Sequence, residues 1–215
     1  MKKVLVTGGA GYIGAHTAVE LVSAGYLPVI VDNFCASERH MVQRIRSLAG
    51  VSVPLHELDC RHAAALARVF EVEGPIFGVI HFAAHKSVGV SVRRPREYYA
   101  NNLGSLTTLL EVMDAKRVER LVFSSSCTVY GQPESLPVTE QTPLRRPESP
   151  YGRTKQMCEA ILDDVARSRS EPPTDRSHPE TPLRAITLRY FNPVGAHPSG
   201  RMGELPLGKP ETLVP

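Results

Sequence analysis

Residues 4–14 read VLVTGGAGYIG, and this stretch decides the fold predicted for the chain. A short apolar run, Val4–Val6, precedes the glycines, and an apolar-periodic segment from Tyr12 to Ala24 follows them. Strand, glycine turn and helix in this order form the context of a dinucleotide fingerprint. Glycine is needed because the tight turn demands conformations that a β-carbon resists, and because a pyrophosphate must approach bare N–H groups. A glycine-rich turn is often only a tight turn that binds no nucleotide. Two later features nevertheless favour a nucleotide site at Gly8, Gly11 and Gly14.

The first of these features is an acid at the end of the next predicted strand, 27–32. Asp32 lies eighteen residues beyond Gly14. Its carboxylate can accept hydrogen bonds from both ribose hydroxyls of an adenosine, and its charge would repel a 2′-phosphate. The sequence therefore predicts NAD rather than NADP. Asp32 can also cap the turn that contains Asn33 and Ser37, and both roles can hold together.

Strand and helix patterns alternate along most of the chain. After the first two strands we expect, in order, helix 37–48, strand 51–56, helix 61–70, strand 76–84, helix 97–116, strand 120–124, a helix from Ser149–Pro150 onward, and strand 183–190. This alternation predicts an α/β fold: a doubly wound, parallel Rossmann sheet with helices on both faces. Its ligand crevice should lie at the carboxyl ends of the strands.

The second feature is a tyrosine and a lysine four residues apart. Tyr151 and Lys155 should share one helix face, and Ser126 leaves its strand at the carboxyl end, where ligands bind. Runs of serine are often loop filler, and Y-x-x-x-K is common by chance. Together with the fingerprint and Asp32, however, the three residues predict a site that removes an alcohol proton while hydride leaves the same carbon.

For this chemistry the phenol of Tyr151 has to become acidic. Lowering its pKa from 10 to near 7 takes roughly 4 kcal/mol, and one cation at about 4 Å in an effective dielectric near 20 supplies that order of energy. Lys155 and the positive nicotinamide of NAD⁺ would be two such cations.

Composition excludes several other classes. The 215 residues suffice for one large α/β core, with 42% hydrophobic and 22% charged residues. The net charge of +3 is spread without a basic stripe, which argues against a nucleic-acid partner. No apolar run reaches the length of a signal peptide's apolar region or a membrane span, so we expect a cytoplasmic protein. Four scattered cysteines are expected to be reduced thiols, and eight histidines without ligand spacing predict no metal.

The sequence resembles the extended short-chain dehydrogenase/reductase family, and within it the sugar-nucleotide epimerases. The segments that carry this resemblance are TGGAGYIGAHT (7–17), VIHFAAHKSVGVSV (79–92), FSSSCTVYG (123–131), SPYGRTK (149–155) and LRYFNPVGAHPSGRMGE (188–204). The resemblance implies NAD-dependent epimerisation at carbon 4 of a UDP-hexose, interconverting UDP-glucose and UDP-galactose through a 4-keto sugar. Tyr151 would take the proton from the 4-hydroxyl. The family also dimerises through helices that match 97–116 and 151–167, so a homodimer is expected.

The resemblance also assigns roles by position. In the cofactor site it places Tyr12 and Ile13 at the pyrophosphate, Asp32, Asn33 and Ser37 at the ribose, Asp59 and Cys60 at the adenine, and further Phe82, Ala83, Ala84, Lys86, Asn101, Ser126, Tyr151, Lys155 and Phe191. Ser126, Tyr151 and Asn192 would contact the UDP-sugar substrate. By itself, Lys86 could equally be a solvated surface charge.

The chain departs from the family's pattern at several places. Ala36 replaces a frequent asparagine, Glu211–Thr212 replaces an Asn-Asn pair, and the Pro-rich loop 168–182, expected to be exposed and mobile, looks long. The family also continues beyond Pro215. We therefore expect an NAD-binding Rossmann domain over 1–190, the start of an incomplete substrate-binding region over 191–215, and weak or absent turnover.

Three alternatives stay open. A nucleotide-sugar 4,6-dehydratase would usually carry an acidic pair where Cys127 and Thr128 stand. Epimerases or decarboxylases that act on UDP-glucuronate are a second alternative, which a product assay over several UDP-sugars would separate. A truncated pseudoenzyme could bind NAD without turnover.

Overall fold

The computed structural model describes residues 1–168 and 183–204. Its centre is one sheet of six parallel strands in the order β3-β2-β1-β4-β5-β6. This is the strand order of a doubly wound Rossmann fold, with its switch point between β1 and β4. The predicted fold class is confirmed. The strands are β1 (Lys2–Thr7), β2 (Tyr26–Asp32), β3 (Leu55–Glu57), β4 (Ile76–His81), β5 (Arg120–Ser126) and β6 (Arg184–Tyr190).

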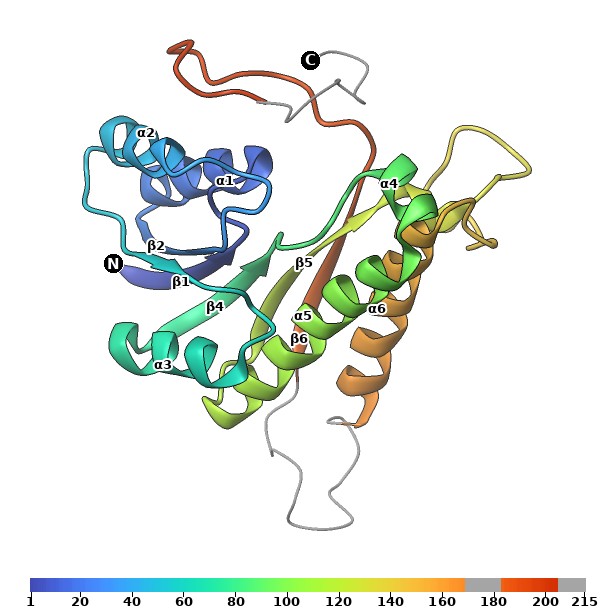
Figure 1. Ribbon diagram of the computed structural model, residues 1–215, viewed down its shortest axis with the longest axis horizontal. Coiled ribbons are helices and arrows are strands. Elements are labelled where there is room, and N and C mark those ends of the chain that lie inside the picture. Colours follow the sequence, from blue (N-terminus) through green and yellow to red (C-terminus); the bar gives the residue numbers. More distant parts are fainter. Residues whose placement is uncertain (169–182, 205–215) are drawn as a thin grey trace.

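Helices cover both faces of the sheet (Figure 1). On one face, α1 (Tyr12–Ser23) and α2 (His40–Ala49) pack on Ile30. On the other, α3 (Ala63–Glu73), α5 (Pro95–Ala115) and α6 (Pro150–Ser168) pack on a larger core that includes Leu5 and Phe123. Two short helices, α4 (Val88–Arg93) and η1 (Cys127–Tyr130), follow the carboxyl ends of β4 and β5. Strands β1 and β2 are therefore covered on both faces, whereas β4 and β5 are covered mainly on the face of α3, α5 and α6.

The boundaries of several elements differ from the predictions. Helix α2 begins at His40 rather than residue 37, because the Ser37 hydroxyl donates to Asp32 instead of starting the helix. Strand β3 is shorter than 51–56, and strand β4 ends at His81 rather than residue 84. Helix α4 was not predicted, although the Ser87 side chain caps it by accepting from the Val90 N–H.

Helix α6 starts as predicted, and its buried side combines apolar with charged residues. The Ser149 hydroxyl accepts from the Gly152 N–H at 3.1 Å, which is N-capping. Ile161, Leu162 and Val165 pack on the larger core, whereas Met157 is 41% exposed. Lys155 and Glu159 are also buried. The buried side of this helix therefore carries charged groups, and the site below depends on them.

After β6 the chain returns across the molecule. Residues 191–204 run over the carboxyl ends of the strands toward α1 and α2 (Figure 1). Most of the loop predicted over 168–182, as well as Glu211 and Thr212, lies outside the described residues.

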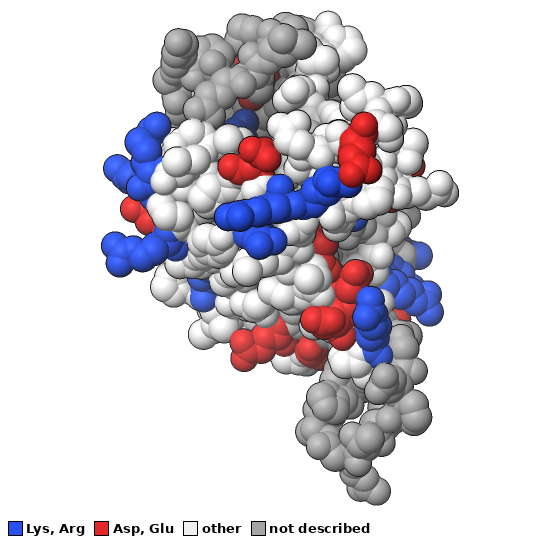
Figure 2. All heavy atoms as spheres, turned by 90° about the vertical axis from the view of Figure 1, so that its right-hand side faces the viewer, with Lys and Arg blue, Asp and Glu red and all other residues white. Residues whose placement is uncertain are grey.

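On the side of the molecule shown in Figure 2, acidic and basic side chains lie next to one another. Within residues 1–168 and 183–204, no helix has the length and apolar character that a membrane span requires.

Candidate active site

The glycine turn after β1 is built so tightly that side chains cannot enter it. Gly8 has φ +69°, and a β-carbon there would lie 2.7 Å from the Ala83 nitrogen. A β-carbon on Gly14 would lie 2.3 Å from the Gly8 carbonyl oxygen. Real β-carbons do not come this close, so both positions require glycine. The turn brings the first helix directly against the strand end.

The amino end of α1 is an anion cradle. Gly11 occupies the N-cap position and provides no side chain to bind the first N–H groups of the helix. These N–H groups, together with the helix dipole, favour a negatively charged group. The residues present thus fit a dinucleotide pyrophosphate, and the assignment of Gly8, Gly11 and Gly14 to it stays a prediction.

Asp32 lies at the carboxyl end of β2 and is 8% exposed. Its Oδ2 accepts from the Ala10 N–H at 2.9 Å, and its Oδ1 accepts from the Phe34 N–H at 2.9 Å and the Ser37 hydroxyl at 2.8 Å. The turn-capping role is therefore present. A carboxylate has about four acceptor positions, so three local bonds leave capacity for a ribose hydroxyl. Asn33 is exposed and accepts from the Cys35 N–H through its side chain.

The segment after β4 lies against the glycine turn. The Phe82 N–H donates to the Thr7 carbonyl at 2.9 Å, and Ala83 lies beside Gly8. Lys86, farther along the same segment, pairs with Glu204 at 3.2 Å. The fold therefore brings predicted cofactor residues from two distant segments together at the switch point.

Asp59 and Cys60 lie beyond β3, near the same edge of the crevice. The Arg61 guanidinium, which donates to both oxygens of Asp59, lowers the pKa of that carboxyl to about 2. Burial raises the pKa of the Cys60 thiol to about 12, and the charges of Asp59 and Asp32 act in the same direction. Cys60 is thus an un-ionised, packed thiol beside two carboxylates.

Ser126 and Tyr151 meet at the carboxyl end of β5. Ser126 is 7% exposed, and its hydroxyl accepts from the Thr128 hydroxyl at 3.0 Å. Burial raises the pKa of Tyr151 above its ordinary value, while a hydrogen bond with the Ser126 side chain opposes that rise. The sequence argument expected the neighbouring lysine to lower this pKa. Within the chain, burial has the larger effect and Lys155 donates to the Ser124 carbonyl; the effect of the nicotinamide cation stays a prediction.

Lys155 is 3% exposed and faces the sheet. Its Nζ donates to the Ser124 carbonyl at 2.7 Å and lies 4.8 Å from the centroid of the Phe123 ring. Burial lowers the pKa of the ammonium to about 8, and the charges of Cys158 and Glu159 oppose that shift. Lys155 therefore stays largely protonated near neutral pH.

Burial together with the charge of Lys155 lowers the pKa of His81, on β4, to about 3. His81 is thus a neutral imidazole, with its Nδ1 2.6 Å from the Thr7 hydroxyl. His81 therefore serves local hydrogen bonding within the sheet.

Asn102 was not predicted to be part of the site. Its side chain is 2% exposed; Oδ1 accepts from the His85 N–H at 2.8 Å, and Nδ2 donates to the Thr154 hydroxyl at 3.0 Å. Asn102 thereby joins the segment after β4 to α6, next to Lys155. Its neighbour Asn101, which was predicted, donates to the Asn102 side chain. The only sequence signal was a polar residue next to the apolar stripe of α5.

Glu159 and Arg189 form a second unpredicted link. Glu159 is 7% exposed; it accepts from Arg189 Nη2 at 2.8 Å and from the Ser125 hydroxyl. Arg189 also donates to the Tyr130 hydroxyl at 3.0 Å. This pair ties α6 to β5 and β6 just beside Ser124 and Ser126. The sequence signal that could have indicated this pair is Glu159 itself, an acidic residue one helical turn after Lys155.

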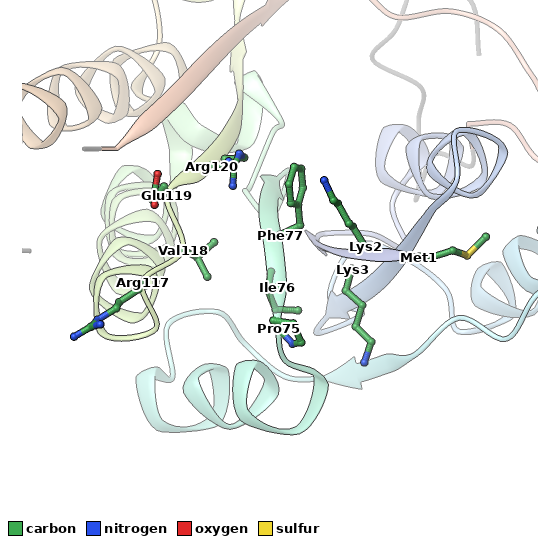
Figure 3. A pocket seen from close by; sticks show the side chains of 10 residues that line it. All are labelled: Met1, Lys2, Lys3, Pro75, Ile76, Phe77, Arg117, Val118, Glu119 and Arg120. Atoms are coloured by element: carbon green, nitrogen blue, oxygen red, sulfur yellow. The ribbon is translucent and has the colours of Figure 1, made fainter. Parts of the chain in front are cut away.

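Other candidates lie apart from this cluster. Phe191 and Asn192 follow β6 and are exposed. A pocket lined by residues such as Lys2, Phe77 and Arg120 opens where β1, β4 and β5 begin (Figure 3). It lies at the opposite end of the strands from Ser126 and takes no part in the site. The described residues contain no group of three or more His, Cys, Asp or Glu side chains placed to hold a metal ion.

Comparisons with known proteins agree with this geometry. The model of the NAD dependent epimerase/dehydratase family matches residues 4–206. The chain is 50% identical to a UDP-glucose 4-epimerase of Yersinia pestis over 212 residues, which cover 99% of the chain and 59% of that protein. It is 48% identical to one of Dictyostelium discoideum over 213 residues, covering 99% and 58%. The chain thus spans under two thirds of these relatives.

Solved structures give the same result. A UDP-glucose 4-epimerase of Bifidobacterium longum in complex with NAD⁺ and UDP superposes with a TM-score of 0.88 at 46% identity, covering 97% of this chain and 59% of that one. The enzyme of Stenotrophomonas maltophila with bound NAD and formylated UDP-arabinopyranose gives 0.90 at 43% identity, covering 99% and 60%. The resemblance stated from the sequence is confirmed.

Proposed function

Because the chain belongs to the NAD dependent epimerase/dehydratase family, we propose that it is the nucleotide-binding part of an enzyme that epimerises carbon 4 of a UDP-hexose. The reaction would interconvert UDP-glucose and UDP-galactose through a 4-keto sugar. The observation that carries the proposal is the convergence of Ser126, Tyr151 and Lys155 at the strand ends that also hold the glycine cradle. Relatives and structures of this activity support it.

The first task of the chain is to hold NAD. We assign the pyrophosphate to the N–H groups at the start of α1, with Tyr12 and Ile13, and the adenosine ribose to Asp32. Lys86 would add positive charge at the pyrophosphate. When bound, NAD supplies a reversible acceptor for the hydride on carbon 4. The remaining cofactor assignments made from the sequence, including Asp59, Cys60 and Phe191, stay proposals.

The second task is proton transfer. The Tyr151 hydroxyl oxygen would take the proton from the sugar 4-hydroxyl, and the Ser126 hydroxyl would orient both groups. Burial by itself raises the pKa of the Tyr151 phenol, which makes it a weaker acid. The hydrogen bond with the Ser126 side chain lowers this pKa and so opposes the effect of burial. Lys155 keeps a positive charge one helical turn away, in the same buried region. Asn192 would face the substrate diphosphate.

Replacing the phenolic hydroxyl tests this assignment. Tyr151→Phe should reduce conversion of UDP-galactose by about a hundredfold or more, since it removes the acid–base group, while bound NAD is retained. The measurement is product sugar after long incubation, with NAD content determined in parallel. UDP-glucuronate, assayed in the same way, distinguishes the related epimerases and decarboxylases. Unchanged turnover in the variant would exclude Tyr151 as the base.

A second candidate function is NAD binding without turnover. One observation favours it: burial raises the pKa of Tyr151, which makes the phenol a weaker acid. A wild-type chain that binds NAD but converts no UDP-sugar would support it. A dehydratase is disfavoured because η1 places Cys127 and Thr128, which carry no carboxylate, directly after the serine strand.

We also propose a homodimer formed through α5 and α6, which lie side by side on the outer face of the sheet (Figure 1). The exposed Met157 on α6 would be covered in such a dimer. Light scattering at micromolar concentration tests this, and a monomer would contradict it. Location in the cytoplasm stays a prediction from the sequence.

A further inference from the structure

The segment from Val194 to Glu204, here called the strap, lies on a part of the molecule that β6 does not reach. Strand β6 ends at Tyr190 on one edge of the sheet, whereas Met202 is buried in the hydrophobic cluster formed by α1 and α2. Between these points the strap passes over the carboxyl ends of the central strands (Figure 1). It therefore crosses the side of the sheet on which the dinucleotide cradle opens.

Two contacts connect the strap to opposite sides of the switch point. The Tyr12 hydroxyl, at the start of α1, donates to the Gly195 carbonyl at 2.6 Å. The Lys86 ammonium, after β4, donates to Glu204 Oε1 at 3.2 Å. Burial and the charge of Glu204 both raise the pKa of Tyr12, which places that carboxylate near the same opening. The strap thus touches both segments that flank the cradle.

The far end of the strap is anchored. Met202 is 2% exposed and packs with Ala15, Ala18 and Met41. A local turn presents it, because the His197 N–H donates to the Met202 carbonyl at 2.7 Å and the Gly200 N–H to the His197 carbonyl at 2.8 Å. Next to it, Arg201 donates to the Ser47 hydroxyl on α2 at 2.8 Å. Met202 is the strap residue buried in this hydrophobic cluster, so it is the main attachment of the strap.

The near end has few attachments. Val194 is 66% exposed, and no atom lies within 4 Å of a β-carbon built on Gly195. Gly195 has φ +134°, a conformation that glycine adopts readily and other residues do not. Apart from the Tyr12 hydroxyl, which donates to its carbonyl, Gly195 is surrounded by open space, so the strap can move at this end without disturbing the sheet.

We propose that the strap closes the dinucleotide crevice and slows release of the bound nucleotide, with Met202 as its anchoring residue. The inference rests on the proposed NAD site. A nucleotide that lies between the cradle at α1 and the segment after β4 would have to pass under the strap to leave. Met202 would act through the strap and not by touching the nucleotide.

Release of labelled NAD into an excess of unlabelled NAD tests the proposal. Met202→Ala should release NAD at least about fivefold faster, since weakening such a closure acts mainly on the dissociation rate. Met113→Ala is the matched control: it removes a buried methionine on α5 from the larger core on the other face of the sheet, and leaves the anchor of the strap intact. Its release rate should stay within about twofold of the wild type, with a similar loss of stability.

A second readout keeps a folding defect separate from loss of closure. Hydrogen exchange of backbone amides in residues 195–204 should slow when NAD is added to the wild type, and less so in Met202→Ala. A wild type that retains no NAD would overturn the proposed function and the strap's role with it. Retention of NAD with equal release rates from both methionine variants, or unchanged exchange in the strap, would overturn the strap alone.

Discussion

The candidate site has two halves, the glycine cradle and the region of Ser126, Tyr151 and Lys155, and the first is formed by main chain whereas the second is formed by side chains. The cradle at Gly8, Gly11 and Gly14 is made of main chain, and its shape is set by where a β-carbon cannot fit. The region of Ser126, Tyr151 and Lys155 is made of side chains, held by buried polar links. The first half is local in sequence and the second joins distant segments. They should therefore fail in different ways when residues are changed.

The largest effect is expected where a buried charge loses its partner. Among the described residues, Arg189→Met leaves the buried Glu159 without its guanidinium partner, with only the Ser125 hydroxyl still donating to it. Removing one partner of a buried pair costs about 3–5 kcal/mol, so the free energy of unfolding in urea should fall by that order. The double variant Glu159→Leu/Arg189→Met should lose less. If the single and double variants were equally stable, the pair would not support the catalytic half as described.

A smaller effect, measured on NAD binding, is expected in the cradle. Gly14→Ala forces a β-carbon against the Gly8 carbonyl, so the turn must open. NAD affinity, measured by calorimetry, should fall about a hundredfold, equivalent to roughly 2.7 kcal/mol. Gly104→Ala is the control, because its β-carbon would find the nearest atom at 3.6 Å. That change within α5 should stabilise the protein by about 0.5–1 kcal/mol and leave NAD affinity unchanged; equal loss in both variants would remove the steric explanation.

The smallest effect is a dependence on pH that belongs to the catalytic half. Burial and the charge of Lys155 lower the pKa of His81 from 6.5 to about 3. Below pH 6.5, His81 binds a proton in the unfolded chain but stays neutral in the folded chain. The free energy of unfolding therefore falls as the pH falls, by up to about 1.4 kcal/mol per pH unit. His81→Gln should flatten the slope of unfolding free energy between pH 6.5 and 5. An identical slope would assign it to other groups.

Local signals predicted much of the fold. The fingerprint, Asp32 and the alternation of strands and helices gave the sheet, its crevice and the first half of the site, because each depends on residues close together in the chain. The Ser149 cap of α6 was predicted for the same reason. The predictions were wrong where a tertiary contact competes with a local pattern, as when Ser37 bonds Asp32 instead of beginning α2.

The hydrogen bonds and the ion pair that hold the region of Ser126, Tyr151 and Lys155 could not be predicted from residues close together in the chain. Asn102 meets Thr154 across 52 positions, and Arg189 meets Glu159 across 30. The sequence by itself determined that a glycine turn, an acid and a Tyr–Lys pair would lie at the strand ends, because strand direction and helix period fix those positions. Only the tertiary structure decided that Lys155 points to Ser124, that the phenol of Tyr151 becomes less acidic, and that Met202 returns to α1. Burial and charge at these points depend on neighbours that the packing of the sheet brings together.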